Sequence, residues 1–267
     1  MVAPAPLKIA FVLNYWSDRG GTERYAKGLA RWLVHRGHKV HVFCRDAGDS
    51  AQGITFQWWP GTGRGFLGIA EGYLASRFVG LSAFDIVQSF GRSASYDVFR
   101  AGGGVHQAWL DIKNSALPAR LWSRLSPRDY LERWIDRRAF TRAKMVVCNS
   151  QLVLEQVVRI HDVAPQSIRL VRNGVDLQRF RPNRIARSRA RQHWSISSKG
   201  RVAVFVGGGF KRKGLNTAAK AFERVASSSD RLVVIGRDSS GRRLLRSLHR
   251  RLGEQMVVMG HLDDVEN

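Results

Sequence analysis

The sequence predicts an α/β protein made of two doubly wound domains. Two glycine-rich turns, 18–23 and 207–214, each follow a short hydrophobic strand and precede an amphipathic helical pattern. At such a junction the free N–H groups of the helix and the positive end of its dipole point at the turn and form an anion-binding site. Because this context occurs twice, we expect two such domains that face one cleft.

The first domain alternates strands with helices. Its first strand, Ile9–Leu13, is followed by a helix over Thr22–Arg36, and Gly37 stands where a glycine commonly ends a helix. This alternation predicts right-handed crossovers and a mostly parallel sheet. The later patterns predict strands at Lys39–Cys44, Ile54–Trp59, Asp85–Ser89, Lys144–Cys148 and Ile168–Val171. Helices are predicted near Ile69–Phe78, over Ala116–Phe140 and over Gln151–Ile160. Asn149 and Ser150 are the N-cap candidates of the last of these helices.

A polar, arginine-rich stretch divides the chain. We place a complete Rossmann-like domain at 1–183, a linker region at 184–201 and part of a second Rossmann-like domain at 202–267. A doubly wound sheet ordinarily has more strands than the last segment supplies, so we expect a chain that is truncated in its second domain. The elements predicted there are strands Val202–Val206, Leu232–Ile235 and Met256–Met259 and helices Leu215–Ala226 and Arg242–Leu252.

The chain is strongly basic. Its 267 residues include 44 Lys and Arg against 21 Asp and Glu, a net charge of +23, so nucleic acid, anionic lipid and phosphorylated substrates are the partners to consider. An excess of arginine is also what the codon usage of a GC-rich genome produces. No helix-turn-helix, zinc finger or aromatic RNA-binding strand accompanies the charge, which argues against nucleic acid.

The cysteines and the hydropathy indicate the compartment. Cys44 and Cys148 fall in predicted strands without a C-x-x-C pair, which predicts buried free thiols in a reducing cytosol and neither a disulfide nor a metal site. Residues 1–6 are too short and proline-rich for a signal peptide, and no apolar run approaches the roughly 18 residues of a membrane span. We therefore expect a cytoplasmic protein, or one held at a membrane surface.

The two turns contain candidate ligand contacts. Gly20 and Gly21 require positive φ or close approach of a ligand to the backbone, although a tight turn with nothing bound would also use them. The cations of 211–213 precede Gly214 at a helix start, where the dipole disfavours them, so we expect a bound polyanion such as a diphosphate. A solvated basic loop is the alternative, and the residue order is not that of a Walker A loop.

A third glycine cluster, Gly102–Gly104, follows a strand end and precedes His106. Consecutive glycines let the backbone approach a ligand, so we expect His106 to be exposed there and to contact substrate, with a structural histidine as the alternative. Motifs of a nucleophile or of a metal site, such as G-x-S-x-G and H-E-x-x-H, are absent from the sequence.

The predicted helix over Ala116–Phe140 is basic, with Trp and Tyr between its arginines. Several of the arginines recur near one side of the helix, which predicts docking on an anionic membrane surface. The alternative is an ordinary amphipathic helix that packs its apolar residues into the core. The arginines that we place on the acceptor or membrane side are Arg120, Arg124, Arg128 and Arg133.

Together these motifs resemble the retaining, nucleotide-sugar-dependent glycosyltransferases of family 4, which have the GT-B fold. The turn 20–24 is similar to the family's Gly-Gly turn, and residues within 148–182 are similar to its "NS … NGVD … F.P" stretch. The segment 206–214 resembles the opening of the donor domain. Among subgroups the sequence looks most like the glucosyltransferases that build the lipopolysaccharide core, which 96–101 also resembles.

The resemblance implies roles for particular residues. The glycines at 20–21 would contact the donor phosphate or sugar, and Lys213 would bind the donor diphosphate. Gly208 stands where the family has an arginine, so Lys211 would substitute for it, and His106 is a looser match to the histidine near the transferred sugar. The E-x7-E motif that grips the donor sugar is not in this sequence.

The function implied by the resemblance is transfer of a hexose from a nucleotide-diphosphate sugar to a glycan or lipopolysaccharide-core acceptor with retention. No metal or other cofactor is implied, because cations and helix dipoles can stabilise the leaving diphosphate. The implied partners are the nucleotide sugar, a glycan or lipid-linked acceptor and the anionic inner face of the cytoplasmic membrane, where the protein would be peripheral. Because the sequence lacks E-x7-E, one alternative is an inactive, membrane-associated binding remnant. A nucleic-acid-binding protein is a second and less favoured alternative, which rests on the high positive charge.

Overall fold

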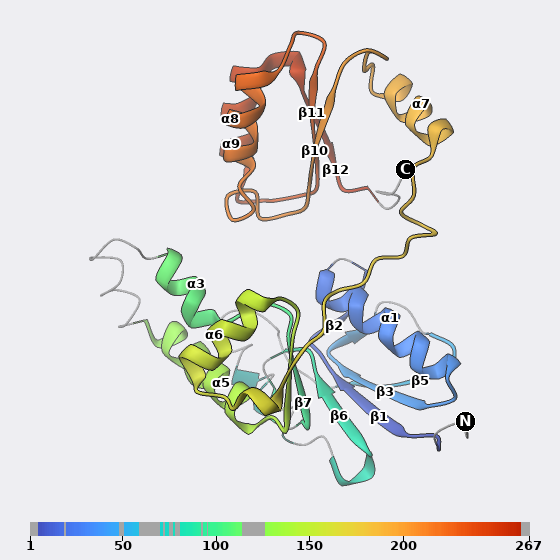
Figure 1. Ribbon diagram of the computed structural model, residues 1–267, viewed down its shortest axis with the longest axis vertical. Helices are drawn as coiled ribbons and strands as arrows, with labels where there is room; N and C mark the ends of the chain where they lie inside the picture. Colours follow the sequence, from blue (N-terminus) through green and yellow to red (C-terminus); the bar gives the residue numbers. More distant parts are fainter. Residues whose placement is uncertain are drawn as a thin grey trace. The chain divides into compact units, whose positions relative to one another are not determined.

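The computed structural model describes residues 5–18, 20–47, 51–58, 70–71, 73–74, 77, 81–91, 93–94, 96–113 and 126–262. The chain divides into two units, Met1–Gly174 and Val175–Asn267. Figure 1 colours unit 1 from blue to yellow and unit 2 from yellow to red. The sequence pattern places the end of the first domain later, at 183, where the arginine-rich stretch begins.

Unit 1 is organised around a parallel sheet of seven strands. These are β1 (Lys8–Val12), β3 (Lys39–Cys44), β5 (Ile54–Trp58), β6 (Ile86–Ser89), β7 (Val98–Ala101), β8 (Met145–Cys148) and β9 (Ile168–Leu170), beside a short parallel pair, β2 (Tyr15–Trp16) and β4 (Asp46–Ala47). Their order is β5-β3-β1-β6-β7-β8-β9, so the chain builds outward from β1 to β5 and then returns to the other side of β1. Ligands of doubly wound sheets bind beyond the carboxyl ends of the strands at such a reversal.

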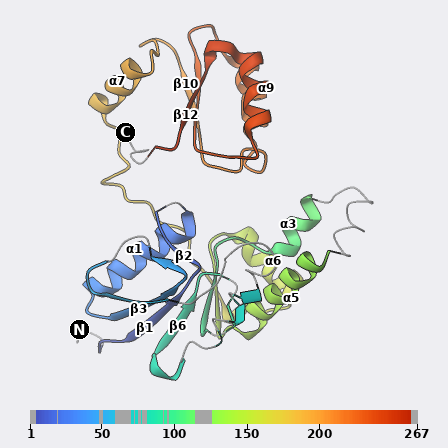
Figure 2. The ribbon, with the colours of Figure 1, turned by 180° about the vertical axis from the view of Figure 1, so that it is seen from behind.

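Helices cover both faces of this sheet. They are α1 (Gly21–His35), α3 (His106–Lys113), α5 (Pro127–Arg142) and α6 (Gln151–His161), with 3₁₀ turns at Leu81–Ala83 and Pro165–Ser167. Figures 1 and 2 show α1 on one face and α5 and α6 on the opposite face. Strand alternation explains the division: Ile9 and Phe11 pack with Ala30 of α1, whereas Val12 belongs with Phe140 of α5 to the other core.

Helix ends in unit 1 follow the local signals of the sequence. Gly37 lies in the left-handed region at φ +85°. Its N–H donates to Val34 O at 2.9 Å and ends α1, as predicted. The Ser150 hydroxyl accepts the N–H of Val153 at 3.3 Å and caps α6, which confirms one of the two N-cap candidates.

Unit 2 carries a second parallel sheet, in the order β10-β11-β12. Its strands are β10 (Val202–Val206), β11 (Arg231–Ile235) and β12 (Met256–Gly260), and its helices are α7 (Arg184–His193), α8 (Leu215–Val225) and α9 (Arg242–Leu252), which a 3₁₀ turn at Gly253–Gln255 follows. α8 and α9 enclose a core around Phe210 and Leu232, and Ile196 packs against Val233 and Ile235 on the other face. The strands and helices predicted after residue 202 are all present.

Several segments differ from the sequence-based expectation. The helix expected over Ala116–Phe140 does not run through Ser126, which is extended and caps the start of α5 at Pro127. Arg184–His193, expected within a linker, forms α7, because Asn183 Oδ1 accepts the N–H groups of Ile185 and Ala186, each at 3.0 Å. The residues after the third glycine cluster, expected as an exposed loop, form α3, and His106 is its first residue.

Other expectations are confirmed, and some fall outside the described residues. Cys44 and Cys148 are buried and free, as predicted. Residues 116–125, which include Arg120 and Arg124, lie outside the described part of the chain, as does most of the helix expected near 69–78. Of the residues described, none belongs to a helix with the length and apolar character needed to cross a membrane.

Candidate functional site

The structure brings together two of the glycine turns singled out in the sequence. A Cβ atom at Gly102, after β7, would lie 3.5 Å from the hydroxyl of Thr22 in the first turn of α1. Asn149, which follows β8, donates from Nδ2 to Gly102 O at 3.1 Å. The carboxyl ends of β7 and β8 and the start of α1 therefore form one site in unit 1, close to the reversal of strand order.

Gly20 and Gly21 serve this site in different ways. The expectation of positive φ is wrong, because Gly20 has φ −130° and Gly21 is the first residue of α1. A Cβ at Gly20 would collide with the carboxylate of Glu23, which folds back over the start of the helix. A Cβ at Gly21 would meet no atom within 4 Å, so the space beside Gly21 is open to a ligand.

His106 is held by acidic residues of α5. Its side chain is only 10% exposed, and Nε2 lies 3.2 Å from Glu132 Oε2 and 3.9 Å from Asp129 Oδ1. The ring stacks on Trp109, and the backbone N–H donates to Asp136 Oδ2 at 2.8 Å. The expected exposure of His106 is therefore wrong, and these contacts give it a part in fixing the glycine loop against α5.

The carboxylates around His106 belong to α5, which is distant from it in the sequence. Glu132 is buried and also binds Arg128, whose Nε lies 2.9 Å from Oε1. Ile135 and Phe140 anchor the same helix in the core, while Trp134 stays 38% exposed. Local sequence reasoning missed this cluster, because only the fold places α3 beside α5.

In unit 2 the predicted donor loop follows β10. Gly207 has φ +131°, and a Cβ there would collide with Lys213 Nζ, so the ammonium group lies directly over this glycine. A Cβ at Gly208 would lie 2.7 Å from the backbone oxygen of Arg237, which is the second residue after β11. The structure thus brings Lys213 and the glycine loop together, and Lys213 and Lys211 are both exposed.

The start of α8 beside this loop is suited to an anion. Gly214 is its N-cap in the left-handed conformation, with no side-chain capping bond and no acidic residue in the first turn. Such a helix end leaves backbone N–H groups and the positive end of the dipole without compensation. Lys213 adds a full positive charge at the same place, which favours a phosphate there.

Asp238, which was not among the predicted site residues, holds the loop after β10. Its Oδ2 accepts the N–H of Phe210 at 2.7 Å. Its Oδ1 accepts from Ser240 N at 3.0 Å, from the Ser240 hydroxyl at 2.6 Å and from Gly241 N at 3.1 Å. These hydrogen bonds, the Ser240 hydroxyl first, hold the pKa of Asp238 below its usual range. The local signal for this role was an Asp-Ser-Ser-Gly turn, which two residues separate from the end of β11.

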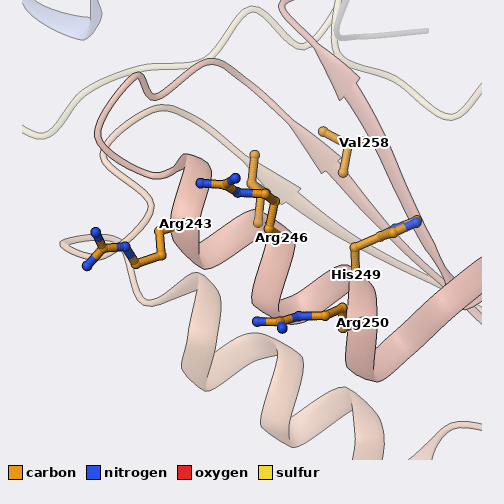
Figure 3. A pocket seen from close by; sticks show the side chains of 6 residues that line it. Arg243, Arg246, His249, Arg250 and Val258 are labelled. Carbon is orange, nitrogen blue, oxygen red and sulfur yellow. The ribbon is translucent and has the colours of Figure 1, made fainter.

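A separate basic depression of about 710 Å³ lies between α9 and β12. Figure 3 shows that its three arginines extend to one side of α9, while His249 points towards the strands. The lining residues are Arg243, Leu245, Arg246, His249, Arg250 and Val258.

Several known proteins similar to this chain are glycosyltransferases. Residues 19–179 match the sequence model of the family described as Glycosyltransferase Family 4. A D-inositol 3-phosphate glycosyltransferase of Saccharomonospora viridis is 26% identical in an alignment of 216 residues that covers 71% of this chain and 48% of that protein. The chain spans about half the length of the curated relatives that it matches.

Solved structures share the fold. WaaG, a glycosyltransferase involved in lipopolysaccharide biosynthesis, has a TM-score of 0.82 at 21% identity, over 97% of this chain and 71% of WaaG. HepE of Anabaena, in complex with UDP and glucose, has a TM-score of 0.66 at 14% identity, over 97% of this chain and 71% of HepE. These likenesses confirm the predicted α/β fold of GT-B type.

Proposed function

This chain belongs to glycosyltransferase family 4, and we propose that it moves a hexose from a nucleotide-diphosphate sugar to a glycan or lipopolysaccharide-core acceptor with retention. The match of residues 19–179 to the family carries the proposal. Two similar proteins support its finer parts: WaaG is involved in lipopolysaccharide biosynthesis, and HepE is solved with UDP and glucose.

The donor diphosphate would bind in unit 2, at the loop after β10. There Lys213 and the uncapped start of α8 concentrate positive charge, and Gly207 lets the ammonium group of Lys213 pack directly over the backbone of the loop. The leaving group of the reaction is a nucleoside diphosphate, so stabilising its developing charge is the main catalytic task. Lys213 and the dipole of α8 supply this charge, and the proposal requires no metal ion.

The acceptor would bind in unit 1, beyond the carboxyl ends of β1, β6 and β7. At the same edge Gly21 leaves space beside α1 for the donor phosphate or sugar, the role that the family resemblance implies, and His106 fixes the loop of Gly102 next to it. Because α5 exposes Tyr130 and Trp134 among arginines, we propose that the protein works peripherally at the inner face of the cytoplasmic membrane, where a lipid-linked acceptor is presented.

A transfer assay on the purified chain tests the proposal. UDP-glucose labelled in the sugar is incubated with lipopolysaccharide-core oligosaccharide that lacks its outer hexoses, and labelled product and UDP release are measured. We expect acceptor-dependent UDP release and an anomeric configuration that matches the donor. Product of inverted configuration would contradict retention.

Binding without turnover separates family membership from activity. Calorimetry with UDP measures the donor site directly, whatever the acceptor. If UDP binds and no offered nucleotide sugar or acceptor supports transfer, the proposed activity of this chain is wrong. If UDP does not bind at all, the proposed donor site at Lys213 is wrong as well.

A further inference from the structure

Arg100 is a buried cation without a carboxylate partner among the described residues. Its side chain is 3% exposed and lies at the end of β7. Nη2 donates to Asn173 Oδ1 at 2.5 Å, and the guanidinium lies 3.5 Å from the ring centroid of Tyr25. Within the described part of the chain Nη1 is buried and makes no hydrogen bond.

Such an arrangement is costly. A buried charge is usually paired, because an amide oxygen and an aromatic face replace only part of the hydration that the guanidinium loses. Desolvation lowers the pKa of Arg100 from its usual value, against smaller opposing effects of Tyr25 and Cys148. Arginine nevertheless stays protonated in proteins, so a permanent positive charge remains without compensation.

The position of Arg100 links this charge to the candidate site. Gly102, two residues further on, approaches Thr22 at the start of α1, and Gly103 beside it is exposed. The carboxylate of Glu23 lies over the start of α1. The guanidinium of Arg100 has no carboxylate partner among the described residues, so its charge is available to attract an anion here. Asn173 is exposed, so a ligand can reach the amide that covers Arg100.

We propose that Arg100 binds a phosphate or carboxylate group of the acceptor, which displaces Asn173 Oδ1 from the guanidinium. This rests on the proposed function only in naming the acceptor as the molecule that carries the anion. Hydrogen bonds from a guanidinium to an ionised oxygen are roughly twice as strong as neutral ones and are often bidentate. The anion would therefore replace a single amide contact by two bonds and give Nη1 a partner.

Calorimetry on the full chain tests the site with three probes: glucose 6-phosphate, glucuronate and glucose. We expect at least one anionic sugar to bind more tightly than glucose, and the stronger of the two identifies phosphate or carboxylate. Arg100→Gln should weaken that binding by about tenfold. Arg159→Gln, a change of the same kind at an exposed position of α6, should leave it unchanged.

A second variant keeps the test valid if Arg100→Gln fails to fold. Asn173→Asp supplies an internal carboxylate beside Arg100, so it should lower the affinity for the anionic sugars by about tenfold. The melting temperature of this variant should stay at or above that of the parent. The proposal would be overturned if Asn173→Asp bound the anionic sugars as tightly as the parent does. It would also be overturned if the parent bound them no more tightly than glucose.

UDP binding distinguishes this site from the donor site. Both variants should bind UDP with unchanged affinity. If Arg100→Gln weakens the binding of UDP and not that of the anionic sugars, the anion belongs to the donor and the assignment to the acceptor is wrong. If the parent does not bind UDP, the proposed function is wrong. The measured binding of anionic sugars at Arg100 is not affected by that result and still tests this inference.

Discussion

At the scale of single residues, Lys213 supplies the charge of the proposed donor loop. Its ammonium group lies over Gly207, at a helix start that has no acidic residue. Lys213→Ala should therefore weaken UDP binding by roughly 1.5–3 kcal/mol, the range for a hydrogen bond to a charged group. Calorimetry measures the change, with Lys220→Ala on the exposed side of α8 as the control. Equal UDP affinity of parent and Lys213→Ala would refute the assignment.

Gly21 provides a second test at this scale. A Cβ atom at this position would meet no atom within 4 Å, so Gly21→Val should leave unit 1 folded while it fills the space proposed for the ligand. We expect sugar transfer to be lost and the circular dichroism spectrum to stay unchanged. Gly28→Val places the same side chain in open space later in α1 and should retain transfer. Global unfolding of Gly21→Val would show that the glycine serves the turn alone.

Individual side chains also mark the limit of sequence-based prediction for the site. The glycine loops and Lys213 could be identified because glycines and cations beside a helix start form a local pattern. The surroundings of His106 could not, because Glu132 and Asp136 reach it only after α5 packs beside α3. Arg100 was missed for the same reason, since its partner Asn173 is distant in the sequence.

At the scale of elements, apolar strands were predictable and polar helices were not. β3 and β10 have the predicted bounds, because polar Lys39 and His41 alternate with apolar residues in β3 and β10 is a short apolar run between polar segments. α7 lacks that signal: none of its residues is buried, and the cap at Asn183 fixes where it begins. A short polar stretch of this kind has the composition of a linker, as the sequence analysis took it to be.

Asp238 provides a prediction about how one element depends on pH. Its carboxylate ties the loop after β10 to the turn after β11, and the hydrogen bonds lower its pKa in the folded state. Its stabilising effect should be complete above the pKa of about 3.9 of an unfolded aspartate and should be lost as the pH falls through the lower folded value. Asp238→Asn should therefore lower the melting temperature near pH 7, and this difference should shrink on acidification.

Melting curves between neutral and acid pH measure the difference. Asp162→Asn is the control, because Asp162 is an exposed C-cap in the left-handed conformation, which asparagine also tolerates. A melting-temperature difference for Asp238→Asn that stays constant or grows as the pH falls would contradict the role given to the ionised carboxylate.

At the scale of the whole molecule, the fold class was predictable because the same strand, turn and helix occur twice. Each unit has a parallel sheet with a glycine loop after its first strand, as the sequence indicated. The charge of +23 says less, because charge distribution governs association and not the fold. Exposed basic surfaces occur in both units, on α5 and on α9, so the anionic partner has to be assigned by experiment.

Vesicle binding tests which surface meets the membrane. On α5 the arginines lie among exposed Tyr130 and Trp134, side chains suited to the headgroup level, whereas Ile135 anchors the helix in the core. Each basic residue near an anionic surface contributes about 1 kcal/mol, which salt weakens. We therefore expect co-sedimentation with anionic vesicles, but not with neutral ones, and a loss when salt is raised. The double variant of Arg128→Gln and Arg133→Gln should reduce this binding.

The matched control removes the same charge from α9. Arg243→Gln with Arg246→Gln lowers the net charge equally, yet these residues line a depression that has no exposed aromatic side chain among its lining residues. If α5 is the docking helix, the α9 variant should pellet almost like the parent, because general attraction to the remaining positive charge changes little. Equal losses for both variants would mean that net charge alone drives the binding. Equal pelleting of the parent with neutral and anionic vesicles would rule out the electrostatic mechanism.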